Sequence, residues 1–341
     1  KVDLHDGLDR DVKDLYVVST SPVMIFKNLL IMGTRVAEGG DAAPGHIRAY
    51  NVLTGKRQWI FHTIPHPGEF GYDTWENKDA WKYIGGVNNW PGMSLDEKRG
   101  VVYLAIGSAT FDFYGGLRKG AGLFANCVLA LDAATGKYLW HFQTVHHDLW
   151  DRDPPAPPNL VTITRDGKKI DAVVQVTKSG FVFILDRDSG KPLFPVNEMP
   201  VPDSSTLIGE QPWPTQPVPE LPKPFAAQRF TEADINPHVP KSSQDIVRKK
   251  LAQLETVNMF GSPGEKGTVI FPGLDGGAEW GGPAVDPTTG VMFVNSNEMP
   301  RLYGLTQPPP PGSPGEKTFQ DRCSVCHGIS RAGSPPAIPS L

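Results

Sequence analysis

Two cysteines and a histidine near the end of this 341-residue chain have a spacing that could attach a haem. Cys323, Cys326 and His327 form the pattern C-x-x-C-H. Two thiols at this spacing can form thioethers to haem vinyl groups, and the histidine can bind the iron. The alternatives are a chance match or a zinc knuckle. Zinc would require a second pair of ligands, but the third cysteine, Cys127, lies alone in an apolar run that fits a buried thiol. The motif therefore predicts haem c, electron transfer and an exported, periplasmic location.

A histidine- and aspartate-rich segment in the middle of the chain is a second place where we expect chemistry. Residues 146–155 read HHDLWDRDPP, which places Asp151 between an aromatic and a basic residue at the mouth of a proline-stiffened loop. Taken alone, Asp151 fits a turn or cap residue, and Lys178 in the segment TKSG fits a solvated charge at a strand edge. His146 and His147 could bind a metal, but loop histidines with ordinary hydrogen bonds are the preferred interpretation.

Composition narrows the class of protein in which these motifs lie. The 33 basic and 37 acidic residues give a net charge of −4, which indicates neither a nucleic-acid partner nor an anionic membrane surface. No apolar run approaches the roughly 18–20 residues of a membrane-spanning helix; the longest candidate, 23–32, is interrupted by a lysine and an asparagine. The 36 glycines and 34 prolines, with aromatic residues spread throughout, favour many turns between short strands.

A short pattern recurs along the chain and predicts the fold. Each copy has a strand-like segment, an Asp or Asn, a Thr/Ser-Gly-Lys turn and an aromatic residue, at 49–59, 130–140 and 184–194. We expect hairpins in which glycine takes a positive φ, the Asp or Asn caps the turn, and the aromatic packs against the next unit. Such repeats indicate an all-β fold, a β-propeller with radially stacked blades; a β-sandwich is the alternative.

Composition also divides the chain into parts. Residues 1–305 are assigned to the propeller, with a long surface excursion at about 197–265 that is rich in Pro and Gln at its start. Within it, 242–257 has helical spacing. The Pro- and Gly-rich residues 306–317 predict a stiff linker, and 318–341 are assigned to the start of a small α-helical cytochrome c domain.

Several segments together resemble the pyrroloquinoline quinone (PQQ) dependent dehydrogenases, and most closely the membrane glucose dehydrogenase branch of that family. The resemblance rests on the repeats, on H-D-L-W-D-x-D-P at 147–154, on T-K-S-G-x-x-F-x-L-D-R at 177–187 and on E-W-G-G at 279–282. It extends over roughly 33–299. The family implies an eight-bladed propeller with PQQ on its axis, of which this chain would cover only part.

The resemblance carries catalytic and cofactor roles to three residues. Asp151 matches the general base that takes the substrate hydroxyl proton, and it lies at the calcium site. Lys178 matches the cation beside the quinone oxygens, where it would stabilise developing negative charge. Trp90 matches the indole that stacks under the PQQ ring, since an aromatic face can hold a flat cofactor. A correctly protonated carboxylate is the group that such a base needs.

Four further residues are carried over to the same site. Thr110 matches a position at the calcium site that binds near PQQ, and Glu38 matches a calcium-binding glutamate of the alcohol dehydrogenase branch. Calcium prefers carboxylate and carbonyl oxygens, and a hard cation polarises a quinone carbonyl. Asn295 or Asn297 would contact PQQ, with the register between them left open.

The resemblance implies PQQ- and calcium-dependent oxidation of a sugar or alcohol hydroxyl, with a glucose-like substrate favoured and haem c passing electrons to the respiratory chain through a cytochrome or quinone acceptor. The alternatives are a quinate or alcohol dehydrogenase of the same family and a non-catalytic propeller scaffold. Eight blades need more β sequence than the chain provides, and a distal haem ligand would lie beyond residue 341. We therefore expect a trimmed piece of a longer, exported protein.

Overall fold

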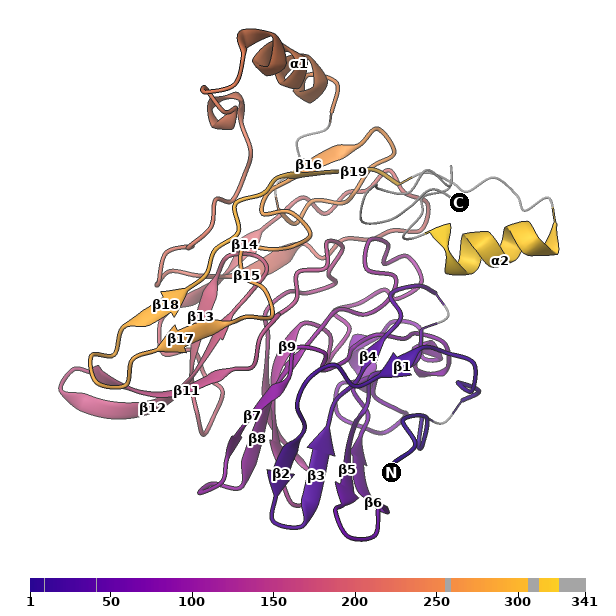
Figure 1. Ribbon diagram of the computed structural model, residues 1–341, viewed down its shortest axis with the longest axis vertical. Helices are drawn as coiled ribbons and strands as arrows, with labels where there is room; N and C mark the ends of the chain where they lie inside the picture. The colour runs from indigo at the N-terminus through magenta and orange to yellow at the C-terminus, as the bar shows by residue number, and fades with distance from the viewer. Residues whose placement is uncertain (9, 41, 255–258, 306–312, 325–341) are drawn as a thin grey trace. The chain divides into compact units, whose positions relative to one another are not determined.

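The fold is described from a computed structural model that covers residues 1–8, 10–40, 42–254, 259–305 and 313–324. The chain divides into two compact units, residues 1–303 and 304–341 (Figure 1). Cys326 and His327 of the haem motif lie outside the described residues.

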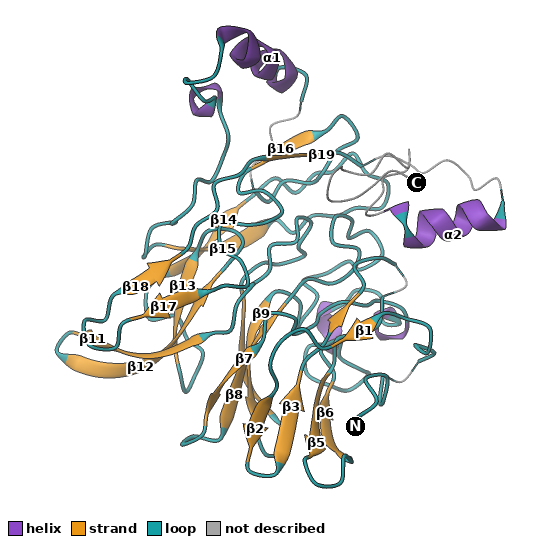
Figure 2. Ribbon diagram, viewed as in Figure 1, coloured by secondary structure: helices purple, strands orange, loops and turns teal. Residues whose placement is uncertain are grey.

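Short antiparallel strands dominate the first unit (Figure 2). One four-stranded sheet has the order β2-β3-β5-β6 (Met24–Phe26, Leu29–Met32, Ile47–Asn51, Arg57–Phe61). A second has the order β10-β9-β8-β7 (Tyr138–Gln143, Cys127–Asp132, Val101–Ile106, Met93–Asp96). The next sheets are β11-β12-β13 (Asn159–Arg165, Lys168–Val176, Val182–Asp186) and β17-β18 (Pro283–Val285, Met292–Val294).

The four sheets are arranged radially, because the first strand of each contacts the first strand of the next. β2 contacts β7, β7 contacts β11, and β11 contacts β17. Each sheet is built from strands close together in sequence, and neighbouring sheets meet through their first strands, which is the arrangement of propeller blades. The β-sandwich alternative, in which two sheets stack face to face, does not fit these contacts. The structure includes four such sheets among the described residues.

The repeat turns have the chemistry that the sequence predicts. Their glycines have φ near +70°, at Gly55, Gly136, Gly190 and Gly290, a region that glycine adopts without a steric penalty. The side chain that precedes each turn accepts backbone hydrogen bonds across it, as Asp132 Oδ1 does from Thr135 N at 2.8 Å. Local residue types are therefore enough to set these hairpins.

The tryptophan of a repeat docks on the turn of the following blade, as predicted. Trp59 donates from Nε1 to the Ala133 carbonyl at 3.3 Å, and its ring lies so close to Gly136 that a Cβ there would meet it at 2.5 Å. Trp140 repeats this contact one blade later, on Gly190 and the Arg187 carbonyl. The glycine is thus needed both for its φ and for the space that the indole fills.

The third repeat departs from the pattern, and the long excursion begins there. Phe194 does not dock on the next turn, since a Cβ at Gly290 would meet nothing within 4 Å. Instead the chain forms a hairpin, β14 (Val196–Pro200) with β15 (Thr215–Pro219), and later the helix α1 (Lys241–Leu251). The helix predicted at 242–257 is present but ends at Leu251. The hairpin was not predicted, because prolines lack the backbone donor that a strand uses.

The remaining elements are short. Two further sheets have two strands each: β1 with β4 (Val17–Val18, Arg35–Val36) and β16 with β19 (Thr268–Ile270, Arg301–Tyr303). The described 3-10 turns are η1, η2 and η3 (Tyr72–Thr74, Ala80–Lys82, Glu232–Asp234). In the second unit, α2 (Pro314–Arg322) begins within the segment assigned to the linker and is capped by Ser313, whose Oγ accepts from Glu316 N at 3.1 Å. Neither α-helix in the described part of the chain has the length and apolarity to cross a membrane.

Candidate active site

A cavity of about 420 Å³ opens among the loops that connect the sheets. It is lined by Thr20, Ser21, Arg35, Val36, Ala37, Glu38, Gly86, Asn88, Trp90, Ser108, Thr110, Asp112, Asp151, Asp153, Lys178 and Trp280. These residues come from strand β4, from the loops that follow β1, β4, β8, β10 and β12, and from the loops that precede β7 and β17. The volume lies within the range of small-molecule and cofactor sites, and the radial packing of the blades brings residues far apart in sequence to one place.

Lys178 lies at the centre of the charged side of this cavity. Its Nζ is 2.6 Å from Asp151 Oδ2, 3.6 Å from Asp153 Oδ2 and 4.0 Å from Glu279 Oε1. The same ammonium lies over the Trp90 ring, 5.4 Å from its centroid. The arrangement places a buried cation between an aromatic face and several carboxylates, which favours a cation–π contact in addition to the ion pairs.

Asp153 is the carboxylate that fixes this arrangement. Its Oδ2 accepts from Trp90 Nε1 at 2.9 Å, and its Oδ1 accepts from the backbone N and the Oγ of Ser108 at 2.7 and 2.8 Å. Its carbonyl also accepts from the backbone N of Lys178 at 2.9 Å. Asp153 therefore orients both the indole and the lysine, and a buried carboxylate with this many donors remains ionised.

The backbone near Asp151 and Lys178 is constrained. Asp151 has φ +55°, a left-handed conformation that aspartate adopts more readily than most residues. Gly276 has φ +73°, and a Cβ there would lie 2.5 Å from Lys178 Cγ. The carbonyl of Lys178 accepts from Gly277 N at 2.7 Å. The strand end that carries the lysine is thus held by a glycine turn that has no room for a side chain.

The carboxylates around Lys178 have pKa values shifted in opposite directions. Burial and the nearby charge of Asp153 raise the pKa of Asp151 well above its usual value, although Lys178 opposes the shift. Burial acts on Asp153 too, but Lys178, Ser108 and Trp90 outweigh it and leave the pKa of Asp153 lowered. Two neighbouring acids with separated pKa values are the arrangement that acid–base chemistry uses, with Asp151 as the group able to take up a proton.

A second acidic region of the cavity could hold a cation. Burial, followed by the charges of Glu38 and Asp153, raises the pKa of Asp112 well above its usual value. Glu38 lies at the rim, where its carboxylate is 3.8 Å from the Arg35 guanidinium. Thr110 is buried beside them and its Oγ1 accepts from Gly85 N at 3.3 Å. Crowded oxygens with an excess of negative charge are the donor set that calcium prefers.

The structure brings together five of the seven residues assigned from the sequence to the PQQ and calcium site. Glu38, Trp90, Thr110, Asp151 and Lys178 all line the one cavity. They come from five separate loops, and only the packing of the blades makes them neighbours.

The two asparagines and the haem motif stand apart from that group. Asn295 is exposed, and Asn297 contributes a backbone bond to the Gly277 carbonyl at 2.9 Å; neither is among the described residues that line the cavity. The expected contacts of Asn295 and Asn297 with PQQ stay a prediction. Of the haem-motif residues, Cys323 is described, directly after α2, with its backbone N donating to the Phe319 carbonyl at 2.8 Å.

Several residues of the site have roles that the sequence did not reveal. Asp153 and Glu279 lie in segments that were noted as family-like, yet nothing in those segments indicated which carboxylate contacts Lys178. Asp112 lies two residues after Thr110 and carries a strongly raised pKa. Trp280, largely exposed, completes the cavity wall. Asp153 could have been singled out only by its position two residues after Asp151, and the sequence does not show that the two side chains converge.

The adjacent histidines have structural partners, in agreement with the preferred interpretation. His147 Nε2 lies 2.8 Å from Glu210 Oε1, and its Nδ1 lies 3.0 Å from the Gly120 carbonyl. His146 lies 2.6 Å from Gln143 Oε1 and 3.1 Å from Glu198 Oε1. Glu210 and Glu198 belong to the excursion, so these histidines attach that segment to the loop that carries Asp151.

Blades in radial order around a charged, cofactor-sized cavity define a β-propeller with an enzyme-like site. The chain matches the family described as PQQ, glucose/ethanol/alcohol dehydrogenase, β-propeller domain, over residues 1–330. It belongs to this family of PQQ-dependent dehydrogenases, whose named members oxidise CH–OH groups. The resemblance noted in the sequence is thereby confirmed at the level of the family.

The relatives and solved structures agree on family and fold. The chain is 36% identical to a quinoprotein glucose dehydrogenase of Gluconobacter oxydans, over 86% of this chain and 36% of the relative. It is 38% identical to a quinate/shikimate dehydrogenase (quinone) of Acinetobacter baylyi, over 87% and 37%. The quinohemoprotein alcohol dehydrogenase from Comamonas testosteroni has the same fold, with a TM-score of 0.60 and 24% identity over 85% of this chain and 39% of that one. The chain thus spans about 36–39% of the length of these proteins.

Proposed function

We propose that the cavity binds PQQ and calcium and that the protein oxidises a hydroxyl group of a sugar or related polyol. The observation that carries this proposal is the Asp151–Lys178 ion pair of 2.6 Å, set beside Trp90 in the cavity of a chain that belongs to a PQQ family. A non-catalytic scaffold would have no use for a buried acid with a raised pKa next to a fixed cation.

The residues present fit both groups. Trp90 offers a face for a flat ring system, and Lys178 offers a cation to its oxygens. Oxygen ligands for calcium would come from Glu38, Asp112 and Asp151, with Thr110 beside them. The charge of calcium would offset the negative charge of these carboxylates, which Lys178 alone does not balance. When bound, PQQ supplies a quinone that accepts the hydride, and calcium supplies a hard cation next to it.

The chain's own residues would handle the proton. Asp151 Oδ takes the proton of the substrate hydroxyl, for which its raised pKa brings its basicity closer to neutral pH than that of an ordinary aspartate. Lys178 remains charged, because its three neighbouring carboxylates hold its pKa above the usual value although burial opposes them. Asp153 keeps the lysine and the Trp90 ring in register through its hydrogen bonds. Each group is positioned before the substrate arrives, which reduces the reorganisation that the reaction requires.

A glucose-like substrate is favoured, and quinate or a simple alcohol is the alternative. Relatives named for glucose and for quinate are about equally similar, at 36% and 38% identity. Electrons would leave through a haem c attached to Cys323 and Cys326, with His327 as an iron ligand, to a cytochrome or quinone acceptor in the periplasm. The C-x-x-C-H pattern supports this part of the proposal.

Reduction of an artificial dye, with PQQ and calcium added, tests the oxidation. Glucose, quinate and ethanol are compared, and Asp151→Asn is expected to lower kcat by about 10²–10⁴-fold. Asp166→Asn is the matched control, since Asp166 has φ +51°, close to that of Asp151, but its side chain is exposed. PQQ-dependent turnover that survives in Asp151→Asn would remove the assigned base, and failure to bind PQQ in the presence of calcium would overturn the proposal.

A separate measurement tests the haem. A haem joined through thioethers stays with the polypeptide after denaturation, so haem-stained denaturing gels of protein matured with a c-type haem assembly system should show a stained band. Cys323→Ser combined with Cys326→Ser should abolish that band. An unstained wild-type band would overturn the haem assignment and leave the oxidation proposal intact.

A further inference from the structure

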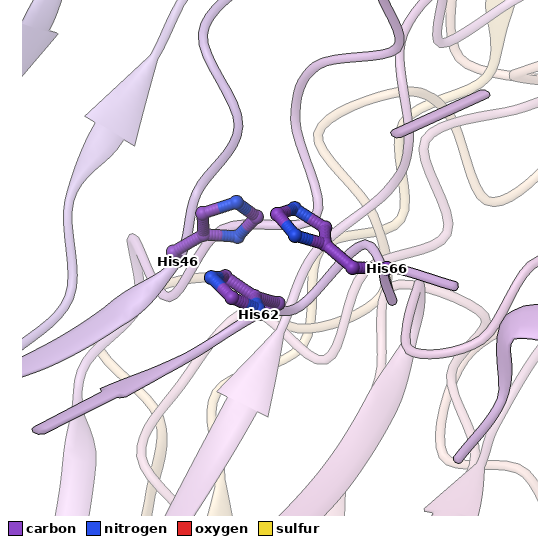
Figure 3. Close-up of side chains that lie close together, drawn as sticks. All are labelled: His46, His62 and His66. Carbon is purple, nitrogen blue, oxygen red and sulfur yellow. The ribbon is translucent and has the colours of Figure 1, made fainter. Parts of the chain in front are cut away.

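Three histidines gather outside the PQQ cavity, where β5 begins and β6 ends. The ring nitrogens of His46, His62 and His66 that could bind a metal all lie within 4.8 Å of one another (Figure 3). His46 is 1% exposed, and His62 and His66 are half-buried. None of the three histidines lines the PQQ cavity, so the cluster has no part in the chemistry proposed for Asp151 and Lys178.

The strand register brings the first two histidines together. Ile47 at the start of β5 is paired with Phe61 at the end of β6. His46 and His62 are the next residues outward on each strand, so they face one another across the end of the hairpin. His66 follows four residues later on the loop that leaves β6. The cluster is thus fixed to a rigid element on one side and to a loop on the other.

A carboxylate already orients one of these rings. His62 Nδ1 lies 2.8 Å from Glu69 Oε1, and the other oxygen of Glu69 accepts from the backbone N of His66 at 2.7 Å. A histidine that donates from Nδ1 to a carboxylate presents Nε2 as an acceptor, which is the usual outer-shell arrangement of metal-binding histidines. Glu69 therefore aims His62 and also holds the turn that carries His66.

The donor set defines the class of cation. Three imidazoles with no carboxylate among them suit zinc and its first-row neighbours cobalt, nickel and copper, and they do not suit calcium or magnesium. Three protein ligands leave a fourth position for water. The site would therefore be selective against the cation expected in the PQQ cavity.

Binding requires two adjustments. The His62 and His66 rings are stacked, with centroids 3.8 Å apart and planes inclined by 10°, so their in-plane lone pairs cannot meet one ion until a ring turns. His46 Nδ1 accepts from Thr63 N at 3.1 Å; binding through Nε2 would shift the ring proton to Nδ1, with Thr63 Oγ1 as an acceptor 3.4 Å away. The nitrogens would also close to about 3.4 Å, the spacing around tetrahedral zinc.

We propose that His46, His62 and His66 form a second metal site, selective for zinc-class divalent cations, which ties the β5–β6 hairpin to the loop that follows it. Its location gives it a structural consequence. Gly45, beside His46, packs directly against Asn88 and donates to the Gly86 carbonyl at 2.8 Å. Both Gly86 and Asn88 line the PQQ cavity, so a cation here would stiffen one of its walls.

Cobalt(II) is the probe, because its visible absorption reports tetrahedral nitrogen coordination and needs no enzyme activity. The whole protein is stripped with a chelator, given excess calcium to fill the acidic cavity, and titrated with Co²⁺ and then Zn²⁺. Metal retained after gel filtration is counted by mass spectrometry. We expect one tightly held equivalent and a rise in Tm with zinc, as follows when a ligand binds only the folded state.

Matched variants separate this site from others. His62→Gln with His66→Gln should lose the equivalent and the zinc-dependent rise in Tm, whereas His238→Gln, at an exposed histidine, should keep both. Cys323→Ser with Cys326→Ser should also keep them, which excludes binding by the C-x-x-C-H motif. Unchanged binding in a folded His62/His66 variant, or binding lost in the cysteine variant, would overturn the proposal. Circular dichroism establishes that each variant is folded.

Discussion

One lysine and one arginine in this protein each gather three carboxylates, yet the two clusters have different properties. The carboxylates around Lys178 belong to Asp151, Asp153 and Glu279, and those around Arg99 belong to Asp96, Asp171 and Asp188. The Lys178 side chain is 7% exposed and lies in the cavity, whereas that of Arg99 is 29% exposed and joins turns and strands of neighbouring blades. Equal numbers of charges therefore do not imply equal roles.

The shape of the cation explains part of the difference. The guanidinium of Arg99 gives each carboxylate its own nitrogen, with Nε 2.8 Å from Asp188 and the two terminal nitrogens 3.0 and 2.8 Å from Asp96 and Asp171. Lys178 has one ammonium at 2.6, 3.6 and 4.0 Å from its three partners. A planar fork satisfies several acids at once, whereas a compact ammonium favours the nearest.

Burial explains the rest, as the pKa shifts show. At Arg99, hydrogen bonds outweigh desolvation and lower the pKa values of Asp96 and Asp171, so those acids remain ionised. Near Lys178, desolvation raises the pKa values of Asp151 and Glu279, whereas Asp153, which accepts several hydrogen bonds, keeps a lowered pKa. The surface cluster stabilises the fold, whereas the buried cluster keeps an acid ready to exchange a proton at the expense of stability.

Removing each cation should have the largest effect and should separate the clusters. Lys178→Gln leaves buried carboxylates without a counter-ion and is expected to lower the free energy of unfolding by about 3–5 kcal/mol. Arg99→Gln removes a partly exposed network and should cost about 1 kcal/mol. Urea denaturation at neutral pH measures both. Equal losses would mean that burial does not distinguish the two clusters.

A glycine substitution next to each cluster should have an intermediate effect. Gly276 and Gly100 have similar φ values, +73° and +68°, but a Cβ at Gly276 would collide with Lys178 while one at Gly100 would only touch Phe26 at 3.4 Å. Gly100→Ala should cost about 1–2 kcal/mol for its left-handed backbone. Gly276→Ala should cost about 1–3 kcal/mol more, from overpacking, and should also weaken PQQ binding. Thermal unfolding and PQQ titration of both variants check this, and identical behaviour would show that Lys178 can move without cost.

The smallest effect expected is a difference of sign in the response to pH. Because the folded-state pKa of Asp171 is lowered, its contribution to stability is present above the unfolded value of about 4 and is lost as the pH falls through the folded value. Asp171→Asn should therefore destabilise by about 0.5–1 kcal/mol at pH 7, with the loss disappearing in acid.

Asp151 should show the opposite sign. Its folded-state pKa is raised, so ionisation opposes folding as the pH rises above the unfolded value, and this cost disappears as the pH falls. Asp151→Asn should be more stable than the wild type at pH 7 and no more stable near pH 3. Urea midpoints for both variants across this range check the prediction, and a destabilised Asp151→Asn at pH 7 would contradict the shift assigned to Asp151.

Much of the blade architecture could be predicted because it depends on short-range chemistry. Turns such as the one capped by Asp132 and closed at Gly136 need only a side-chain acceptor and a residue that tolerates positive φ. The packing of Trp59 against the next unit was also predicted, since the repeat places an aromatic at a constant distance from each glycine, and the structure shows that the contact is with the turn of that unit. The β14–β15 hairpin was missed because its prolines give the opposite signal to that of a strand.

The candidate site was predictable only where a family-like motif marked it. Asp151 and Lys178 were expected together, and their side chains lie 2.6 Å apart. The choice between Asn295 and Asn297 as a PQQ contact could not be made from spacing and stays open. The histidine cluster was missed entirely, because His46 and His62 become neighbours only through the pairing of β5 with β6.

The sequence by itself determined the turn chemistry, the repeat that stacks the blades and the family to which the chain belongs. Each of these depends on residues close together along the chain, whose preferences are nearly independent of what surrounds them. Only the tertiary structure decided which acids share Lys178, which of them has a raised pKa, and which histidines meet at the end of a hairpin. Those properties arise from burial and from distances between distant segments, and they exist only once the blades have packed.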